Sequence, residues 1–275
     1  MTLILTQISK YGIIHASDSN LTSHQGPAGE SQKTFAVPFL HAGLTVAGSF
    51  SVHRVPMNDW MTQFIQSQAD TGTSSLTEFA RNLGKELTAQ MTASEKEHGS
   101  IVHMAGYVFE GDQAHPEFWF IRNVTGVDAE TGEYTGISPT FCVTEDFWTR
   151  DCPKYKLLES FQQEGYYQLY INGFASGRIS YVALQSIINQ VLFQIWNNPQ
   201  WSFRPPKSLE EAEALIKQFM NLIGTLFMLS DYHAPLIGGD VQTYLIPQPP
   251  NTVTESPLPQ QQKQNPHSEC PGFNV

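Results

Sequence analysis

Cysteine, basic side chains and long apolar runs are scarce in this sequence, and each shortage excludes a class of protein. The three cysteines, Cys142, Cys152 and Cys270, are odd in number and scattered, with no CxxC pair. We therefore expect reduced thiols, and neither a disulfide framework nor a zinc site. Lysine and arginine number 15 against 26 acidic residues, a formal net charge of -11. Because nucleic acids and anionic membranes attract basic surfaces, this charge argues against both as partners.

Signals for membrane insertion, export and cofactor binding are also lacking. No apolar run approaches the roughly 20 residues that a membrane-spanning helix needs. The opening residues MTLILTQISKYG have no basic segment, long apolar core or small-residue cleavage site, so no signal peptide is expected. The sequence holds no internal repeat, no glycine-rich phosphate loop and no metal-ligand spacing among its nine histidines. These absences predict a cytoplasmic protein that needs no metal or cofactor.

Apolar residues, by contrast, make up 40% of the chain, which is ample for a core of two or more layers. Many form short runs that are typical of strands and are bounded by glycine and polar residues. Residues 19–32, between the second and third runs, are polar and glycine-containing, which predicts a loop. Residues 124–165 give no clear signal. The predicted strands are residues 3–8, 12–17, 34–38, 43–47, 101–110, 117–123, 166–171 and 241–246.

Four helices are predicted where apolar residues recur at helical spacing. Two of them begin at a capping box, Ser75 with Glu78 and Ser208 with Glu211, in which serine and glutamate satisfy free backbone amides. The helical stripes lie within residues 60–65, 76–91, 180–196 and 209–226. The side chains that the last helix is expected to bury are Leu215, Phe219, Leu222, Ile223 and Leu226.

The order of elements is strands, two helices, strands, two helices and a final strand. This order predicts an α+β protein, a four-layer αββα sandwich of two mainly antiparallel sheets flanked by helix pairs. Residues 1–246 are expected to form one domain. Residues 247–275 are rich in proline, glutamine and asparagine and poor in large apolar side chains. They cannot bury enough surface to offset their ordering entropy, so we predict a disordered tail.

Four short motifs resemble, in order, the β-subunits of the proteasome and their bacterial relatives. The motifs are TLIL at 2–5, GIIHASDS at 12–19, KTF at 33–35 and AGLTVAG at 42–48. The aspartate and serine that end the second motif, after an apolar strand, are the most specific feature. The resemblance covers residues 2–123 well and 166–246 loosely. It implies the N-terminal nucleophile (Ntn) hydrolase fold.

The same resemblance implies a threonine-type amidohydrolase that forms an acyl-enzyme at Thr2 once Met1 has been removed. The α-amino group of Thr2, with an ordinary pKa of about 7.7–8.0, would accept the proton of its own hydroxyl. Lys33 would lie beside Thr2 and stabilise negative charge, and Asp18 would keep that lysine charged. The amide of Gly48 would donate to the oxyanion. The implied substrate is a peptide or a small amide, and the implied assembly is a homo-oligomer, as a ring or a stack.

The C-terminal half departs from the family's pattern. The stretch 171–174, which corresponds to the family's Gly-Ser-Gly, has no serine. Ile237 replaces the serine of Ser-Gly-Gly, and Ala234 falls where the family has an aspartate. Either Asn172, Ser176 or Asp231 substitutes by another route, or the site has lost proteolysis. Three functions stay open: a peptidase, an inactive subunit that serves as a scaffold or binding module, and a hydrolase of small amides.

Each candidate residue also has a purely structural alternative. Asp18 has the position of a turn residue that ends a strand, Lys33 that of a solvated loop lysine, and Gly48 that of a turn glycine. The histidines on predicted strands, including His15 and His103, are expected to be ordinary core or surface residues.

Overall fold

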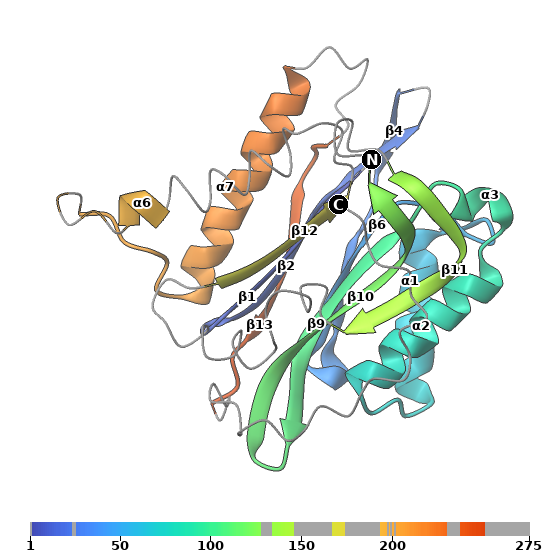
Figure 1. The fold of residues 1–275 in the computed structure, drawn as a ribbon, viewed down its shortest axis with the longest axis horizontal. Helices are drawn as coiled ribbons and strands as arrows, with labels where there is room; N and C mark the ends of the chain where they lie inside the picture. Colours follow the sequence, from blue (N-terminus) through green and yellow to red (C-terminus); the bar gives the residue numbers. More distant parts are fainter. Residues whose placement is uncertain are drawn as a thin grey trace.

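The computed structural model of the chain describes residues 2–23, 26–127, 134–145, 167–173, 193–196, 198, 200, 202–229 and 237–250. Within these residues two antiparallel sheets lie face to face, and helices pack on the outer face of each (Figure 1). The protein therefore belongs to the α+β class, as predicted. None of the described helices is long and apolar enough to span a membrane.

The first sheet is built around the N-terminal hairpin. β1 (Leu3–Ser9) and β2 (Gly12–Asp18) pair with each other as predicted. β12 (Tyr167–Gly173) pairs with the other side of β1, and β13 (Val241–Pro247) pairs with β2, so the strand order is β12-β1-β2-β13. β1 is thus a central strand, and Thr2 stands directly before it.

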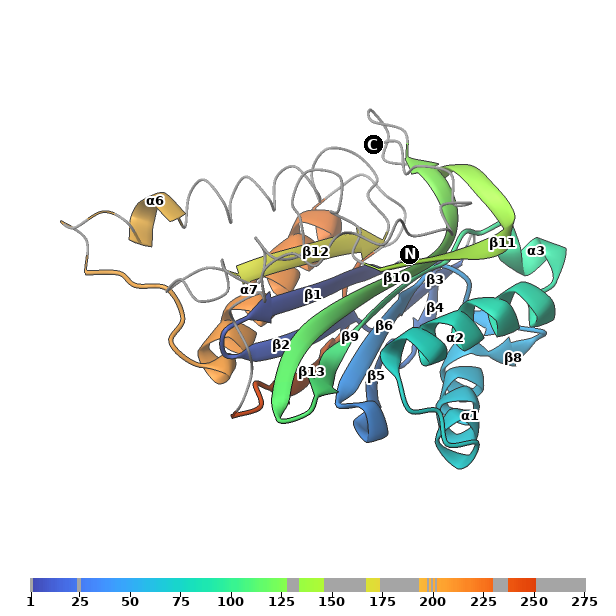
Figure 2. The same ribbon diagram turned by 60° about the horizontal axis from the view of Figure 1, so that its bottom comes forward.

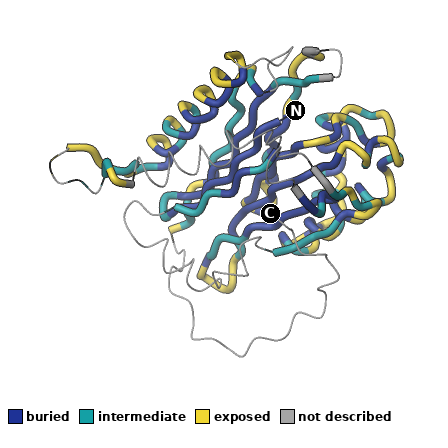
Figure 3. The backbone as a smooth tube through the Cα atoms, turned by 45° about the horizontal axis from the view of Figure 1, so that its top comes forward, coloured by how far each residue is buried: buried dark blue, intermediate teal, exposed yellow. Residues whose placement is uncertain are grey.

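Every residue of β1 is buried, because the strand packs on both of its faces. Leu3 and Leu5 belong to the apolar cluster under helix α7 (Leu209–Met228). Ile4 and Ile8 belong to a second cluster, which fills the space between the two sheets. Successive side chains of β1 therefore point alternately into two apolar layers. In a strand with one face exposed they would point alternately into the core and into water. Figure 3 shows the two sheets as the buried centre of the molecule.

The second sheet has the strand order β11-β10-β9-β6-β5, and all of its pairs are antiparallel. The predicted strands at its centre are confirmed, although β10 extends beyond residues 117–123 at both ends. β11 lies in the region that gave no sequence signal. The strands are β5 (Thr34–Val37), β6 (Ala42–Ala47), β9 (Ile101–Glu110), β10 (Gln113–Val127) and β11 (Tyr134–Glu145).

The loop predicted at residues 19–32 is wrong in its middle part. β3 (Asn20–Ser23) and β4 (Gly26–Glu30) form a separate two-stranded ribbon. β4 has the sequence GPAGE, and glycine and proline are depleted in strands, so local propensity gave no strand signal. A second ribbon of β7 (Ser51–Val52) and β8 (Val55–Pro56) leads into the first helix.

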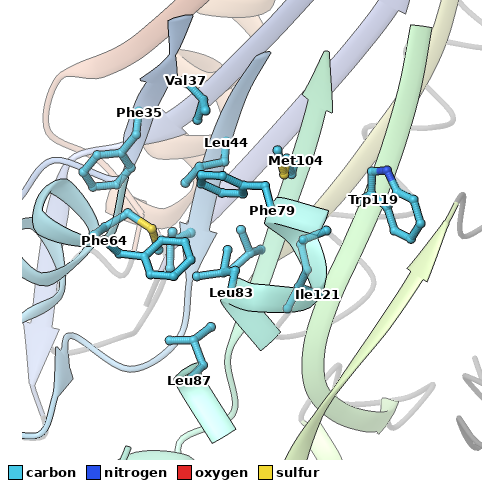
Figure 4. Packing of buried hydrophobic residues seen from close by; sticks show 14 of the residues in the cluster. Phe35, Val37, Leu44, Phe64, Phe79, Leu83, Leu87, Met104, Trp119 and Ile121 are labelled. Atoms are coloured by element: carbon cyan, nitrogen blue, oxygen red, sulfur yellow. The ribbon is translucent and has the colours of Figure 1, made fainter. Parts of the chain in front are cut away.

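Two helices, α1 (Met57–Asp70) and α2 (Leu76–Gln90), cover the outer face of the second sheet (Figure 2). Their apolar side chains pack against those of the strands, and Phe79 lies in the middle of this cluster (Figure 4). A Cβ atom at Gly84 of α2 would stand only 2.4 Å from Cγ2 of Val143, so the helix approaches β11 closely. The two predicted helices of this half are therefore confirmed.

Serine caps begin α2 and α7 at the predicted residues. Ser75 Oγ accepts a hydrogen bond from the Glu78 amide at 3.1 Å, and Ser208 Oγ accepts one from the Glu211 amide at 3.2 Å. The return bond of a capping box is displaced, because each glutamate carboxylate accepts from the amide one residue before the cap. The caps thus satisfy amides on both sides of each helix start.

α7 covers the outer face of the first sheet with a face that overlaps the predicted one only in part, since Phe219 and Ile223 are buried as predicted. Leu222 is 44% exposed and Leu226 is 39% exposed, so their predicted burial is wrong. Because α7 is apolar on more than one side, helical spacing alone does not say which stripe faces the sheet. The side chains that α7 buries are Leu209, Ala212, Ile216, Phe219, Met220, Ile223 and Phe227.

Two predictions fall largely outside the described residues. Of the helix expected at 180–196, only α6 (Phe193–Trp196) is described, and it is helical. Of the predicted tail, residues 251–275 lie outside the described ranges, and β13 continues one residue past the predicted boundary, to Pro247.

The expectation of reduced thiols is wrong for Cys142. This residue of β11 is disulfide-bonded. An odd number of scattered cysteines does not exclude one bond, because the sequence gives no distance between thiols that lie far apart in the chain. Disulfides persist mainly in oxidising compartments. The cysteines therefore give no support to a cytoplasmic location.

The disulfide predicts a definite number of free thiols. Of the three cysteines, the bond at Cys142 consumes two, so a denatured, unreduced chain should react with one alkylating group. Full reduction should raise the count to three. Mass spectrometry after alkylation with and without reductant measures both counts. Three alkylated thiols without reductant would contradict the bond.

Candidate active site

The centre of the site is an ion pair between Asp18 and Lys33. Asp18 ends β2 and Lys33 directly precedes β5, so the pair joins the two sheets. Lys33 Nζ lies 3.3 Å from Asp18 Oδ2, and the two side chains are only 7% and 3% exposed. Lys33 Nζ also donates to the backbone carbonyl of Asn20. Lys33 is therefore not a solvated loop lysine, and two of the predicted site residues are in direct contact.

The Asp18 carboxylate also holds two distant segments of backbone. Its Oδ1 accepts a hydrogen bond from the Leu3 amide at 2.8 Å, next to Thr2. Its Oδ2 accepts from the Gly238 amide at 3.4 Å, in the segment before β13. Asp18 thus connects the start of β1 and the Gly238–Gly239 segment with Lys33, which is more than a turn residue does.

Burial opposes the charge on both members of the ion pair. It raises the pKa of Asp18, while the charge of Lys33 and the Leu3 amide act to lower that pKa. Burial likewise lowers the pKa of Lys33, and the charge of Asp18 acts to raise it. Each charge therefore depends on its partner, because neither is stabilised by water. A lysine with a lowered pKa is a better partner for a reaction that moves protons near neutral pH.

Gln242 of β13 positions the backbone around Lys33, and the sequence gave no indication of it. Its Oε1 accepts from the Lys33 amide at 2.7 Å and from the Thr34 amide at 3.3 Å. Its Nε2 donates to the Ser31 carbonyl at 2.7 Å. A polar residue in a strand carries no sequence signal for a contact with a segment about two hundred residues away. Only the pairing of β13 with β2 brings Gln242 to this place.

Thr2 lies in close contact with the end of β12. It is 6% exposed, and Leu3, the next residue, pairs with Gly173. A Cβ atom at Gly173 would stand 1.9 Å from the Thr2 carbonyl oxygen, and the φ of Gly173 is 118°. Both facts require glycine at this position. Through the Asp18–Leu3 hydrogen bond, the structure brings Thr2 next to the ion pair.

Gly48 follows β6 and is exposed. Its φ is 113°, and a Cβ atom would stand 2.0 Å from the Gly99 carbonyl oxygen, so the backbone admits only glycine. Its connection with the ion pair runs through Val46, whose amide donates to the Lys33 carbonyl at 2.9 Å. This conformation explains the glycine structurally and is also compatible with an oxyanion donor.

Asn172 does not replace the family's serine by direct contact with Thr2. Its side-chain Oδ1 lies 2.6 Å from His103 Nε2, in the space between the sheets. His15 and His103 are both 0% exposed and hydrogen-bonded, as expected for core histidines. Burial lowers their pKa values to about 4 and about 3. Ile237, in place of the serine of Ser-Gly-Gly, is 1% exposed and belongs to the apolar cluster under α7. Ala234 and the two other candidate substitutes, Ser176 and Asp231, lie outside the described residues.

Two cavities flank the site. One, of about 360 Å³, lies between Asp18 and the second half of α7 and is also lined by Gly238. The other, of about 440 Å³, adjoins Gly48 through the next residue, Ser49, and is lined by the short helix α3 (Ala93–Lys96). The first cavity therefore gives a small ligand room beside Asp18, whereas none of the candidate site residues lines the second.

Glu95 of α3 holds the turn between β7 and β8 beside the second cavity. Its carboxylate accepts from the amides of His53 (3.0 Å) and Arg54 (2.9 Å) and from the hydroxyl of Ser51 (2.6 Å). His53 and Arg54 have φ values of 48° and 66°, a conformation that costs a non-glycine residue about 1–2 kcal/mol. Burial raises the pKa of Glu95, but these bonds and those from Thr92 outweigh it and lower the pKa to about 2.

No family model and no curated protein matches the chain. No group of metal-ligating side chains occurs among the described residues. The chemistry of the site therefore has to be argued from its own geometry: a buried lysine–carboxylate pair beside a threonine at the start of a central strand.

Replacing Asp18 by asparagine should leave Lys33 buried without a counter-charge. Breaking a buried pair in this way costs about 3–5 kcal/mol of unfolding free energy. Urea denaturation of Asp18→Asn and of the wild type measures the difference. Arg204→Gln is the matched control, because it breaks the exposed Arg204–Glu211 pair and should lower the unfolding free energy far less. Equal effects of the two substitutions would contradict the assigned role of Asp18.

Glu95 should contribute stability that disappears in acid. Its pKa is lowered from 4.5 to about 2 by folding, so its contribution is present above pH 4.5 and is lost as the pH falls toward 2. In Glu95→Gln this part of the acid destabilisation should be absent. Glu97→Gln, at an exposed neighbour, should keep the wild-type profile. Thermal unfolding between pH 2 and pH 7 is the measurement, and parallel curves for wild type and Glu95→Gln would contradict the assignment.

Proposed function

We propose that the chain is an Ntn-type threonine amidohydrolase, a proteasome-like peptidase whose nucleophile is Thr2 after removal of Met1. The observation that carries the proposal is the buried Asp18–Lys33 pair, whose carboxylate also holds the amide of Leu3. A buried charge pair is costly to keep. Its position beside the first residue of a central strand matches the arrangement that the sequence resemblance implies.

The order of layers supports the proposed fold. α7 packs on the first sheet, the first sheet on the second, and α1 and α2 on the outer face of the second. This succession fits a four-layer αββα sandwich, with the start of β1 at its centre. A second helix over the first sheet is expected from the sequence at residues 180–196, of which only α6 (Phe193–Trp196) is described.

The proposed reaction is acyl transfer through two steps. The Thr2 hydroxyl oxygen attacks the amide carbonyl carbon, and its proton passes to the α-amino group of the same residue. The amide of Gly48 donates to the oxyanion, a contact worth about 2.7–4 kcal/mol in comparable sites. The ammonium then gives its proton to the leaving amine, which leaves an ester on Thr2. Water hydrolyses this ester by the same route, and the charge of Lys33 favours each oxyanion.

The proposed substrate is a peptide, and the same chemistry acts on small amides. A homo-oligomer, as a ring or a stack, remains part of the proposal on the strength of the resemblance alone. The cavity lined by Asp18 gives a ligand room beside the ion pair.

An inactive subunit that serves as a scaffold or binding module is the second candidate. The side chain of Asn172 favours it, because that group contacts His103 and not Thr2. Asn172 itself brings no hydroxyl to the stretch where the family has its serine. The two candidates differ in whether Thr2 reacts.

Removal of Met1 and labelling of Thr2 test the proposal directly. The intact mass should correspond to a chain that begins at Thr2, and a β-lactone or epoxyketone should add one group per chain. Thr2→Ala should abolish labelling and peptidase activity, whereas Thr62→Ala, at an exposed threonine of α1, should retain both. A retained Met1 together with an unlabelled chain would favour the inactive subunit.

A further inference from the structure

A chain of polar groups crosses the space between the two sheets. Thr6 Oγ1 lies 3.1 Å from His15 Nδ1 and 3.3 Å from His103 Nδ1. His15 Nε2 lies 3.3 Å from the Ala105 carbonyl oxygen, and His103 Nε2 lies 2.6 Å from Oδ1 of the Asn172 side-chain amide. Thr6, His15 and His103 are all 0% exposed. Each of these groups therefore depends on the others for its hydrogen bonds.

One arrangement of protons satisfies every group in this chain. A carbonyl oxygen only accepts, so His15 carries its proton on Nε2 and its Nδ1 accepts from the Thr6 hydroxyl. The Thr6 oxygen then accepts from Nδ1–H of His103. His103 Nε2 is then an acceptor, which cannot bond to Asn172 Oδ1. The side-chain amide must therefore be turned by 180° from the orientation in the structure, so that its Nδ2 donates to His103; the two ends of an amide are told apart by their hydrogen bonds. The opposite amide orientation would leave one hydroxyl proton for two imidazole acceptors, or require a buried imidazolium.

Asn172 is also the neighbour of the residue that contacts Thr2. It lies on β12, which is an edge strand of the first sheet and pairs only with β1 among the described strands. Asn172 pairs with Ile4, and Gly173 pairs with Leu3 and touches the Thr2 carbonyl. The bond from Asn172 to His103 therefore fastens this end of β12 to β9 of the second sheet.

We propose that Asn172 is a positioning residue for Thr2. By donating to His103 it holds the end of β12 against the second sheet, and Gly173 in turn fixes where Thr2 stands. The contribution to catalysis rests on the proposed function. The proton arrangement and the placement of Thr2 do not rest on it, so they are testable even in an inactive chain.

The proton arrangement is tested by ¹⁵N NMR of the imidazole nitrogens. In the wild type, His15 should be protonated on Nε2 and His103 on Nδ1. Asn172→Asp replaces the donor with a carboxylate, which should draw a second proton onto His103 and raise its pKa from about 3 toward the ordinary 6.5. A wild-type His103 protonated on Nε2 would overturn the proposal, as would an unchanged His103 in Asn172→Asp.

The placement of Thr2 is tested with Asn172→Leu and a control on the same strand, Gln168→Leu, at the end of β12 far from Thr2. Labelling of Thr2 by the electrophile should slow by about ten- to a hundredfold in Asn172→Leu, in the maximal rate and not in the affinity for the reagent. Gln168→Leu should label at close to the wild-type rate. Equal rates in the two variants would overturn the proposal.

Hydrogen exchange separates this proposal from the proposed function. If the wild type is not labelled at all, the peptidase proposal fails, but exchange of the Leu3 amide still reports how firmly the start of β1 is held. That amide should exchange faster in Asn172→Leu than in Gln168→Leu. Identical exchange in both variants would show that Asn172 does not position Thr2.

Discussion

A carboxylate that is almost completely removed from water organises this end of the molecule. Asp18 has no solvent to stabilise its charge, so its stability depends on the partners that the fold supplies. Those partners come from the segment before β5, the start of β1 and the segment before β13. The folded chain must bring all three together before the charge is satisfied. The geometry around Thr2 is therefore a condition of folding as well as of any chemistry.

Local signals predicted most elements of the fold. The strands of the N-terminal hairpin were visible as apolar runs, and Ser75 and Ser208 marked two helix starts because a cap needs a hydroxyl at one defined position. These local signals gave wrong predictions where tertiary packing determines the structure. The ribbon of β3 and β4 contains residues that disfavour strands, and α7 is apolar on more than one side. In these places the neighbouring elements, and not the local sequence, select the structure.

The sequence predicted a smaller part of the candidate site than of the fold. Asp18 and Lys33 were found through a resemblance, and the structure brings them together. Gln242 and the link between Asn172 and His103 were not predicted, because each joins strands that are far apart in sequence. A polar residue within a strand has the same appearance whether it faces water or a buried partner. Only the pairing order of the two sheets distinguishes the cases.

The adjacent residues Asn172 and Gly173 have a consequence for how β12 aligns with β1. Sliding a strand by one residue turns every side chain to the opposite face of the sheet. In a slipped alignment Asn172 would face α7, His103 would lose its donor, and a residue with a Cβ atom would meet the Thr2 carbonyl. Two neighbouring residues, one polar and one without a side chain, thus reject the same misalignment for different reasons. Together they specify the register of β12, the strand that borders Thr2.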